Sequence, residues 1–273
     1  MKKVPIGVFD SGYGGLTVLS ELLEKLPSYD YIYFGDNARA PYGNRSFDVV
    51  YSYTLEAVEF LFSQGCELVI IACNTASAKA LRTIQQNDLV RFGSRKRVLG
   101  VIRPCTEFIS SITSTNCVGV LATQGTVNSN SYGLELKKFA PNVTLVQHAC
   151  PMWVSLIENN MHNTDAGKMI IKEDISTLLS QNKAIDTLVL ACTHYPVIQS
   201  YIEEIAGKEI QVLAQGPLVA DKLIDYLSRH TELDNTLSKD GTVVYFTSEN
   251  CDFFDESASK FMNRNIRSSH IAL

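Results

Sequence analysis

The feature of the sequence that most constrains its fold is a pair of similar segments, "LVIIACNTAS" (69–78) and "LVLACTHYP" (188–196). Each is an apolar run that ends in Ala-Cys and continues with polar residues and a turn. Apolar runs without alternation are typical of strands that are covered on both faces, as in a parallel sheet. The two segments therefore predict two buried strands, each with a cysteine at its carboxyl end.

The rest of the chain alternates short apolar runs with helical patterns. Leucines repeat at helical spacing from Leu16 to Leu26, and helices are also predicted at 47–64 and 164–181. This alternation predicts an α/β protein whose sheets are mainly parallel. Strands are predicted at 6–9, 31–35, 67–73, 98–102, 117–122, 187–192, 210–214 and 243–247.

A weak internal repeat predicts two similar lobes. "IGVFDSGYGGLTV" (6–18) precedes Cys73 much as "VGVLATQGTV" (118–127) precedes Cys192, although chance similarity between apolar strands is the alternative. We expect two α/β lobes with mainly parallel sheets flanked by helices, related by a pseudo-two-fold axis, with the active site in the cleft between them. Residues 1–97 together with 208–273 are expected to form the first lobe, and residues 98–207 the second.

Composition excludes several classes of function. The net charge is −5 and no basic cluster stands out, so we expect no nucleic-acid partner. No window approaches the roughly 20 apolar residues that span a bilayer, and the N-terminal apolar stretch before Asp10 is too short for a signal peptide. We therefore expect a cytoplasmic protein without a membrane partner.

The seven cysteines form no Cys-x-x-Cys pair, and the five histidines stand at no zinc-like spacing from them. The sequence therefore predicts no metal site. Free cysteines are often buried, and most of these are interpreted as small core residues. The cysteines interpreted in this way are Cys66, Cys117, Cys150 and Cys251.

Cys73 and Cys192, at the two strand ends, are interpreted as chemically active and not as core residues. Ligands of α/β sheets bind beyond the carboxyl ends of the strands, and a helix that begins there favours thiolate. Asn74-Thr75 and Thr193-His194 are expected to cap those helices. If the lobes face each other, Cys73 and Cys192 flank one cleft. One thiolate can then remove a proton from a carbon, and the opposing thiol can protonate its other face, which inverts a stereocentre.

Two other classes of function remain open at this point. A thiol redox pair would need its Cα atoms within about 7 Å of each other. A non-catalytic amino-acid-binding protein could use the same cleft, although binding alone does not need two thiols. A hydrolase is less suited, because it needs a nucleophile and a base of different type.

Deprotonation of an amino-acid Cα is difficult, and the sequence has no motif for a cofactor that could act as an electron sink. We therefore expect no cofactor, and expect preorganised polar groups at the strand ends to stabilise carbanion character. The candidates are Asp10, Ser11, Asn74, Thr75, Thr123, Thr126, Thr193 and His194.

Two loops follow the first two predicted strands. "FDSGYGG" (9–15) matches neither a phosphate-binding loop nor a dinucleotide fingerprint, and the carboxylate of Asp10 would repel phosphate. "GDNARAPYG" (35–43) could present backbone N–H groups of Tyr42 and Gly43 to a carboxylate, but an ordinary surface turn explains it equally well.

Four motifs, "GVFDSGYGGLTVL", "GDNARAPYG", "ACNTASA" and "LACTHYP", resemble those of the glutamate racemases, cofactor-independent bacterial enzymes of the Asp/Glu racemase family. The similarity covers essentially the whole chain. It implies the two-lobed α/β fold, interconversion of L- and D-glutamate, and supply of D-glutamate for peptidoglycan synthesis. It also implies a small-molecule substrate and a possible homodimer, since relatives form dimers of differing arrangement.

The resemblance also implies roles for individual residues. Cys73 takes the proton from D-glutamate and Cys192 takes it from L-glutamate. Asp10 matches the carboxylate beside the first thiol and His194 the imidazole beside the second. Glu158, in "VSLIE", matches a further family carboxylate, with Ser155 in the position of the family proline. Substrate contacts carry over to Asp10, Ser11, Tyr42, Gly43, Asn74, Thr75, Thr123, Thr126, Thr193 and His194.

Aspartate racemase is the nearest alternative. That family usually has His after Asn-Thr-Ala and Glu after the second Cys-Thr, where this chain has Ser77 and His194, which favours glutamate. Arg103 stands where many relatives have an acidic residue. It is interpreted as a solvated charge at a strand end, without a function.

Overall fold

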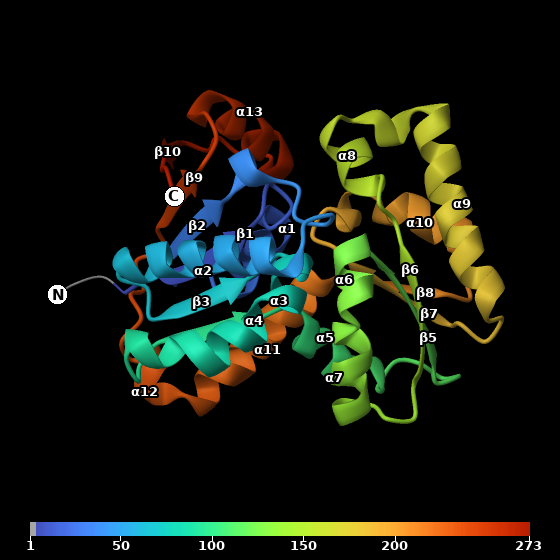
Figure 1. Cartoon of the computed structure of the whole chain (residues 1–273), viewed down its shortest axis with the longest axis horizontal. Coiled ribbons are helices and arrows are strands. Elements are labelled where there is room, and N and C mark those ends of the chain that lie inside the picture. Colours follow the sequence, from blue (N-terminus) through green and yellow to red (C-terminus); the bar gives the residue numbers. More distant parts are fainter. Residues whose placement is uncertain (1–3) are drawn as a thin grey trace.

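The computed structural model describes residues 4–273, and it contains two separate sheets of parallel strands with helices on both sides of each (Figure 1). The first sheet has the order β10-β9-β2-β1-β3-β4, and the second has the order β6-β5-β7-β8. None of the helices in this described part is long and apolar enough to cross a bilayer. The predicted two-lobed α/β fold is confirmed.

The strands of the first sheet are β1 (Ile6–Asp10), β2 (Tyr31–Gly35), β3 (Leu68–Ile71), β4 (Arg97–Gly100), β9 (Val243–Thr247) and β10 (Ser268–His270). Those of the second are β5 (Cys117–Ala122), β6 (Thr144–Ala149), β7 (Thr187–Ala191) and β8 (Gln211–Leu213). The α-helices are α1 (Leu16–Lys25), α2 (Phe47–Ser63), α3 (Asn74–Lys79), α4 (Leu81–Thr83), α5 (Ile102–Ile109), α6 (Gln124–Ser129), α7 (Ser131–Phe139), α8 (Trp153–Glu158), α9 (Asp165–Gln181), α10 (Gln199–Ala206), α11 (Gln215–Arg229), α12 (Thr231–Asp234) and α13 (Cys251–Met262). Short helical turns are η1 (Asn37–Arg39), η2 (Ile84–Asp88), η3 (Leu89–Phe92), η4 (Met161–Asn163) and η5 (Tyr195–Ile198).

The two sheets repeat one topology. The order β2-β1-β3-β4 in the first corresponds to β6-β5-β7-β8 in the second, and β9 and β10 extend only the first. The register repeats as well, because Gly7 pairs with Val69 and Gly119 pairs with Leu188. The equivalence of these strands matches the weak repeat in the sequence.

The central strands are buried on both faces, which explains their continuous apolar sequences. All five residues of β1 and of β7 are buried. Apolar clusters lie on both faces of each sheet: α1 and α11 cover one face of the first sheet and α2 the other, while α9 and α7 cover opposite faces of the second. Burial on both faces fixes the strand ends, and with them the residues that follow.

Two strands belong to a different sheet from the one expected from the predicted lobe boundaries. The strand at 97–100 is the edge β4 of the first sheet and not the start of the second lobe, and β8 at 211–213 is the edge of the second sheet and not part of the first. The cause is the repeated topology, in which each is the fourth strand of its own lobe. The exact bounds of the two lobes remain a prediction.

Two strands were not predicted from the sequence. β6 (Thr144–Ala149) is an edge strand whose residues are all partly exposed or exposed, so its apolar run is interrupted by Gln147 and His148. β10 (Ser268–His270) is a three-residue edge strand of polar residues. The predicted strand at 98–102 also ends early, because α5 begins at Ile102.

The chain crosses between the lobes at two places that touch each other. It leaves the first lobe at Val101, after β4, and returns at Gln215, after β8. The Gln215 side chain is buried and donates a hydrogen bond to the carbonyl of Val101 over 3.5 Å and another to the Tyr132 hydroxyl. The two covalent connections therefore form one narrow joint.

Gly14 lets the lobes approach closely on the side of the strand ends. A Cβ atom at Gly14 would overlap Thr193 Oγ1 and would lie 2.6 Å from His194 Nδ1, both in the second lobe. In the same loop, a Cβ at Gly12 would meet its nearest atom, Glu158 Oε1, at an ordinary 3.6 Å. The absence of a side chain at Gly14 is thus a condition for the observed contact between the lobes.

We predict that Gly14→Ala lowers the free energy of unfolding by roughly 1–3 kcal/mol, the usual cost of forcing extra volume into a packed contact. Urea denaturation of the full chain measures it. Gly12→Ala is the matched control and should change stability by less than about 0.5 kcal/mol. Equal effects of the two substitutions would contradict this account of the interface between the lobes.

Candidate active site

The carboxyl ends of the central strands of both sheets meet at one cavity. Cys73 follows β3 and Cys192 follows β7, and both thiol-bearing residues line this cavity. Each is only 6% exposed. The cavity measures about 20 Å³, close to the space that one water molecule occupies. A ligand of amino-acid size can therefore enter only if the walls move apart.

The cavity brings together most of the predicted site residues and some that were not predicted. Those predicted and found in its lining are Ser11, Tyr42, Gly43, Cys73, Asn74, Thr75, Thr123, Glu158, Cys192, Thr193 and His194. Gly12, Ala40, Pro41 and Val154 also line it and were not predicted. Asp10 and Thr126 are fully buried behind this lining.

Cys73 lies in a neutral-to-acidic environment. Its Sγ is 3.4 Å from Ser11 Oγ and accepts a hydrogen bond from the backbone N–H of Ala76 over 3.4 Å. Burial and the nearby Asp10 carboxylate raise the pKa of the Cys73 thiol to about 12, although these hydrogen bonds oppose the shift. The first thiol therefore holds its proton at neutral pH, which the expectation of a thiolate at the helix N-terminus did not anticipate.

Cys73 itself, and not Asn74 or Thr75, is the N-cap of α3. On the other side His194 stands at the N-cap of a short turn, η5, but its side chain makes no capping hydrogen bond. Asn74 and Thr75 instead lie inside the helix, with their side chains directed at the second lobe.

Asp10, at the end of β1, is a buried carboxylate between the lobes. It accepts hydrogen bonds from the N–H of Gly12 over 2.9 Å and from Thr193 Oγ1 over 3.3 Å. Burial raises the pKa of Asp10, while the charge of His194 and these hydrogen bonds lower it, with burial dominating. Asp10 is thus a buried carboxyl group next to Cys73 whose pKa lies above its ordinary value.

The second thiol has a basic partner. His194 Nδ1 lies 3.9 Å from Cys192 Sγ, and His194 Nε2 is 2.9 Å from Glu158 Oε1 on α8. Burial lowers the pKa of His194, but the interactions with Cys192 and Glu158 outweigh burial and raise it to about 10. A His194 that keeps its proton at neutral pH places a positive charge next to the sulfur of Cys192.

Threonine and asparagine side chains join the lobes along the cavity. Thr75 Oγ1 is 2.9 Å from Thr123 Oγ1, which lies 3.1 Å from Thr126 Oγ1. Asn74 Oδ1 accepts a hydrogen bond from the Tyr132 hydroxyl, whereas Asn74 Nδ2 is buried and has no hydrogen-bond partner. A buried donor without a partner at a cavity wall is suited to a ligand acceptor.

Asp36 is a buried residue of this region that the sequence analysis did not single out, although it lies in the "GDNARAPYG" motif. Its carboxylate accepts hydrogen bonds from the Tyr42 hydroxyl, from Arg39 Nε over 2.7 Å and from Ser248 Oγ over 2.7 Å. These contacts hold the loop that carries Tyr42 and Gly43. Gly43 in turn accepts a hydrogen bond from Gly125 of the second lobe over 2.8 Å.

Residues interpreted as non-functional lie elsewhere. Arg103 is exposed on α5, not at a strand end, and pairs with Glu107 over 2.8 Å. Cys66, Cys117 and Cys150 are buried, as predicted, while Cys251 is partly exposed.

Glu158→Gln tests whether the Glu158 carboxylate sets the charge of His194, the neighbour of the Cys192 thiol. The substitution removes the negative charge beside His194 but keeps the shape of the side chain, so the pKa of His194 should fall from about 10 by roughly one to three pH units. His194 then loses its proton at a lower pH than in the unaltered protein. Titration of the imidazole by NMR in the full chain measures this pKa.

Glu256→Gln, at an exposed carboxylate on α13, is the control and should leave His194 unchanged. An unaltered titration of His194 in Glu158→Gln would show that the Glu158 carboxylate does not set the charge of this site.

Comparison with known proteins agrees with the geometry. The family model described as Asp/Glu/Hydantoin racemase matches residues 7–221. A glutamate racemase of Geobacter metallireducens is 38% identical over 244 residues, which cover 89% of this chain and 87% of that protein.

Solved structures give the same relationship. A glutamate racemase isoform of Bacillus anthracis superposes with a TM-score of 0.90 at 32% identity, over 100% of this chain and 99% of that one. The glutamate racemase of Francisella tularensis, solved in complex with D-glutamate, gives a TM-score of 0.85 at 32% identity, over 100% and 98%. With two thiols at equivalent strand ends in one cavity, the chain belongs to the Asp/Glu/Hydantoin racemase family.

Proposed function

We propose that this protein is a glutamate racemase that interconverts L- and D-glutamate by two-base thiol chemistry. The observation that carries the proposal is that Cys73 and Cys192, from corresponding strand ends of two sheets, line one cavity. The glutamate racemases to which the chain is similar over nearly its whole length support the substrate and the reaction class.

The surroundings of the two thiols suit opposite roles at the start of a turnover. A protonated His194, held by Glu158, places positive charge beside Cys192, which would act as the base that removes the Cα proton of the substrate. Cys73, whose pKa is raised to about 12, would carry the proton that is delivered to the other face. This arrangement favours binding of L-glutamate, the enantiomer that the family resemblance assigns to Cys192.

The reverse direction needs a thiolate at Cys73. Proton delivery from Cys73 would leave a thiolate at Cys73 and a thiol at Cys192, which has gained the substrate proton, and this is the starting state of the reverse direction. Asp10, whose pKa burial raises, lies beside the first thiol. Asp10 and His194 would thus each adjust the charge next to one thiol. The two thiols could exchange their roles in this way, which a reversible racemisation requires.

The carbanion character at Cα has to be stabilised by groups of the chain itself. Asn74 Nδ2 is a buried donor without a partner in the lining, and Thr75 and Thr123 place two hydroxyls beside it. Donors that are fixed before the reaction stabilise developing negative charge more than mobile water does. We assign Asn74, Thr75 and Thr123, with the backbone of Gly43, to the substrate carboxylates.

In the cell, this activity would supply D-glutamate for peptidoglycan synthesis, the role of the family. A cytoplasmic location and a homodimer fit the family as well and remain predictions. Light scattering of the purified protein at several concentrations tests the dimer.

Replacement of either active-site thiol tests the proposal. We predict that Cys73→Ser and Cys192→Ser each lower kcat/KM for racemisation at least about 10²-fold, because a serine hydroxyl is a much weaker acid and base and general acid–base catalysis contributes roughly 10²–10⁴-fold. Chiral chromatography and deuterium incorporation at Cα in D2O, starting from each enantiomer of glutamate, measure both half-reactions.

Cys251→Ser, a partly exposed cysteine outside the cavity, is the matched control and should keep full activity. A fully active Cys73→Ser or Cys192→Ser protein would contradict the two-base mechanism. Binding of glutamate by the folded unaltered protein without any deuterium exchange would instead support the non-catalytic alternative.

Aspartate racemisation is the second candidate, and the same assay with both amino acids separates the two. Ser77 and His194 occupy positions where aspartate racemases usually have His and Glu. Faster turnover of aspartate than of glutamate would overturn the assignment of the substrate and leave the reaction class unchanged.

A further inference from the structure

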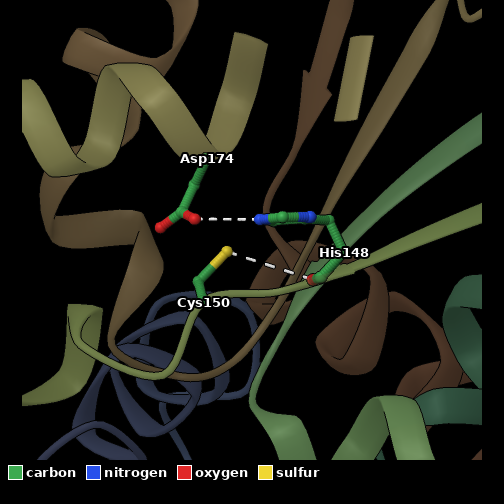
Figure 2. A group of neighbouring side chains, drawn as sticks. All are labelled: His148, Cys150 and Asp174. Carbon is green, nitrogen blue, oxygen red and sulfur yellow. Dashed lines mark hydrogen bonds and ion pairs between the residues drawn. The ribbon is translucent and has the colours of Figure 1, made fainter. Parts of the chain in front are cut away.

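A second cluster of chemically active side chains lies in the second lobe, outside the cavity described above. It consists of His148 on β6, Cys150 just after β6 and Asp174 on α9 (Figure 2). One potential ligand atom from each residue lies within 4.8 Å of the other two. Figure 2 shows that the imidazole, the thiol and the carboxylate point toward a common centre.

We propose that His148, Cys150 and Asp174 form a binding site for a divalent metal ion of the zinc class. Imidazole nitrogen, thiolate sulfur and carboxylate oxygen are the ligands that zinc prefers, at distances of roughly 2.0–2.3 Å. Ligand atoms of a tetrahedral site with such bonds lie roughly 3.3–3.8 Å apart. His148 Nε2 and Asp174 Oδ1 are 2.8 Å apart, and all three ligand atoms lie within 4.8 Å of one another. Ligation would therefore require the nitrogen and the oxygen to separate by about 0.5 Å or more.

The fourth position of such a site would face solvent. The side chains of His148 and Asp174 are 20% and 19% exposed, whereas Cys150 is 1% exposed. An ion can therefore reach the cluster from outside, with a water molecule as its remaining ligand. A neutral imidazole, a thiolate and a carboxylate together carry two negative charges, which a divalent cation balances.

Neighbouring groups already orient the ligands, as the outer shell of a metal site does. Trp153 Nε1 donates a hydrogen bond to Asp174 Oδ2 over 2.7 Å, which leaves Oδ1 directed at His148. The Tyr195 hydroxyl donates to the carbonyl of Cys150 over 3.2 Å and fixes the backbone there. The Cys150 thiol makes a long contact of 4.0 Å to the carbonyl of His148. Burial raises the pKa of this thiol well above its ordinary value, so a divalent cation would have to stabilise the thiolate on binding.

The position of the cluster indicates a structural role next to the catalytic groups. Trp153 begins α8, whose last residue is Glu158, and Tyr195 directly follows His194. The rings of Trp153 and Tyr195 are 4.8 Å apart. A metal ion at the cluster would join β6 to α9, and the hydrogen bond from Trp153 to Asp174 would connect it to α8, which carries Glu158. This site does not depend on the proposed racemase activity.

The spacing of cysteines and histidines in the sequence predicts no metal site. The third ligand, Asp174, comes from a helix 24 residues beyond Cys150 and reaches the other two only through the packing of α9 on the second sheet.

Cobalt(II) titration of the full-length Cys73→Ser/Cys192→Ser protein tests the site, because this background removes the active-site thiols as competing ligands. We expect one equivalent of Co²⁺ to give a sulfur-to-cobalt charge-transfer band in the near ultraviolet, and Zn²⁺ to abolish it by displacement. Zn²⁺ should also raise the Tm of this protein. In the same background, Cys150→Ser should lose the band and the Tm shift.

Asp174→Asn and His148→Gln provide a second test should Cys150→Ser fold poorly. Asn keeps an acceptor for Trp153, and each variant should bind Co²⁺ at least about tenfold more weakly, since loss of even an outer-shell partner costs roughly 10–100-fold. Cys105→Ser, a buried cysteine on α5, is the control and should bind normally. Absence of the band, or a band that persists in all three cluster variants, would overturn the proposal.

Discussion

The contact between the lobes at Thr193 is the interaction on which the site depends. Its hydroxyl donates to Asp10 over 3.3 Å, and its carbonyl accepts a hydrogen bond from Thr17 over 3.0 Å, so one residue of the second lobe is held by two of the first. Cys192 and His194 flank it in sequence. The position of the second thiol relative to the first is therefore set in part by these polar contacts beside Gly14, together with the Thr75–Thr123 and Gly43–Gly125 contacts between the lobes.

The two halves of the site share a backbone plan but differ in their side chains. In each lobe a cysteine follows the third strand of the repeated order, which accounts for a nearly symmetric pair of thiols. One thiol has a hydroxyl and a buried carboxyl group as neighbours, and the other has an imidazole linked to a carboxylate. The repeated strand order thus explains the placement of the thiols, and the different residues around them give the two thiols different surroundings.

Much of the architecture follows from the sequence because the central strands are buried on both faces, and this makes their apolar runs conspicuous. The motifs at their ends also contain most of the residues that line the cavity. Edge strands such as β6 are partly exposed and lack this signal, so it was missed. The assignment of β4 and β8 to their sheets was wrong because hydrophobicity does not say which neighbour a strand pairs with.

Features that depend on tertiary packing could not be predicted in the same way. Asp36 supports Tyr42 through a network that includes Ser248, more than 200 residues away in sequence, and no local pattern reveals it. The pKa of Cys73 follows from burial and from Asp10, which a cysteine at a helix N-terminus does not disclose. The ligands proposed at His148 similarly meet only after α9 has packed on the sheet.

The paired crossings at Val101 and Gln215 have a consequence for how a substrate gains access. Because both covalent connections run through one joint, rotation of the lobes about that joint is the motion that separates the strand ends without breaking either sheet. Such a hinge would open the cavity on the side opposite the joint. The two covalent connections would limit how far the lobes separate. Closure about the same joint would then bring the two thiols back to their relative positions after each release of product.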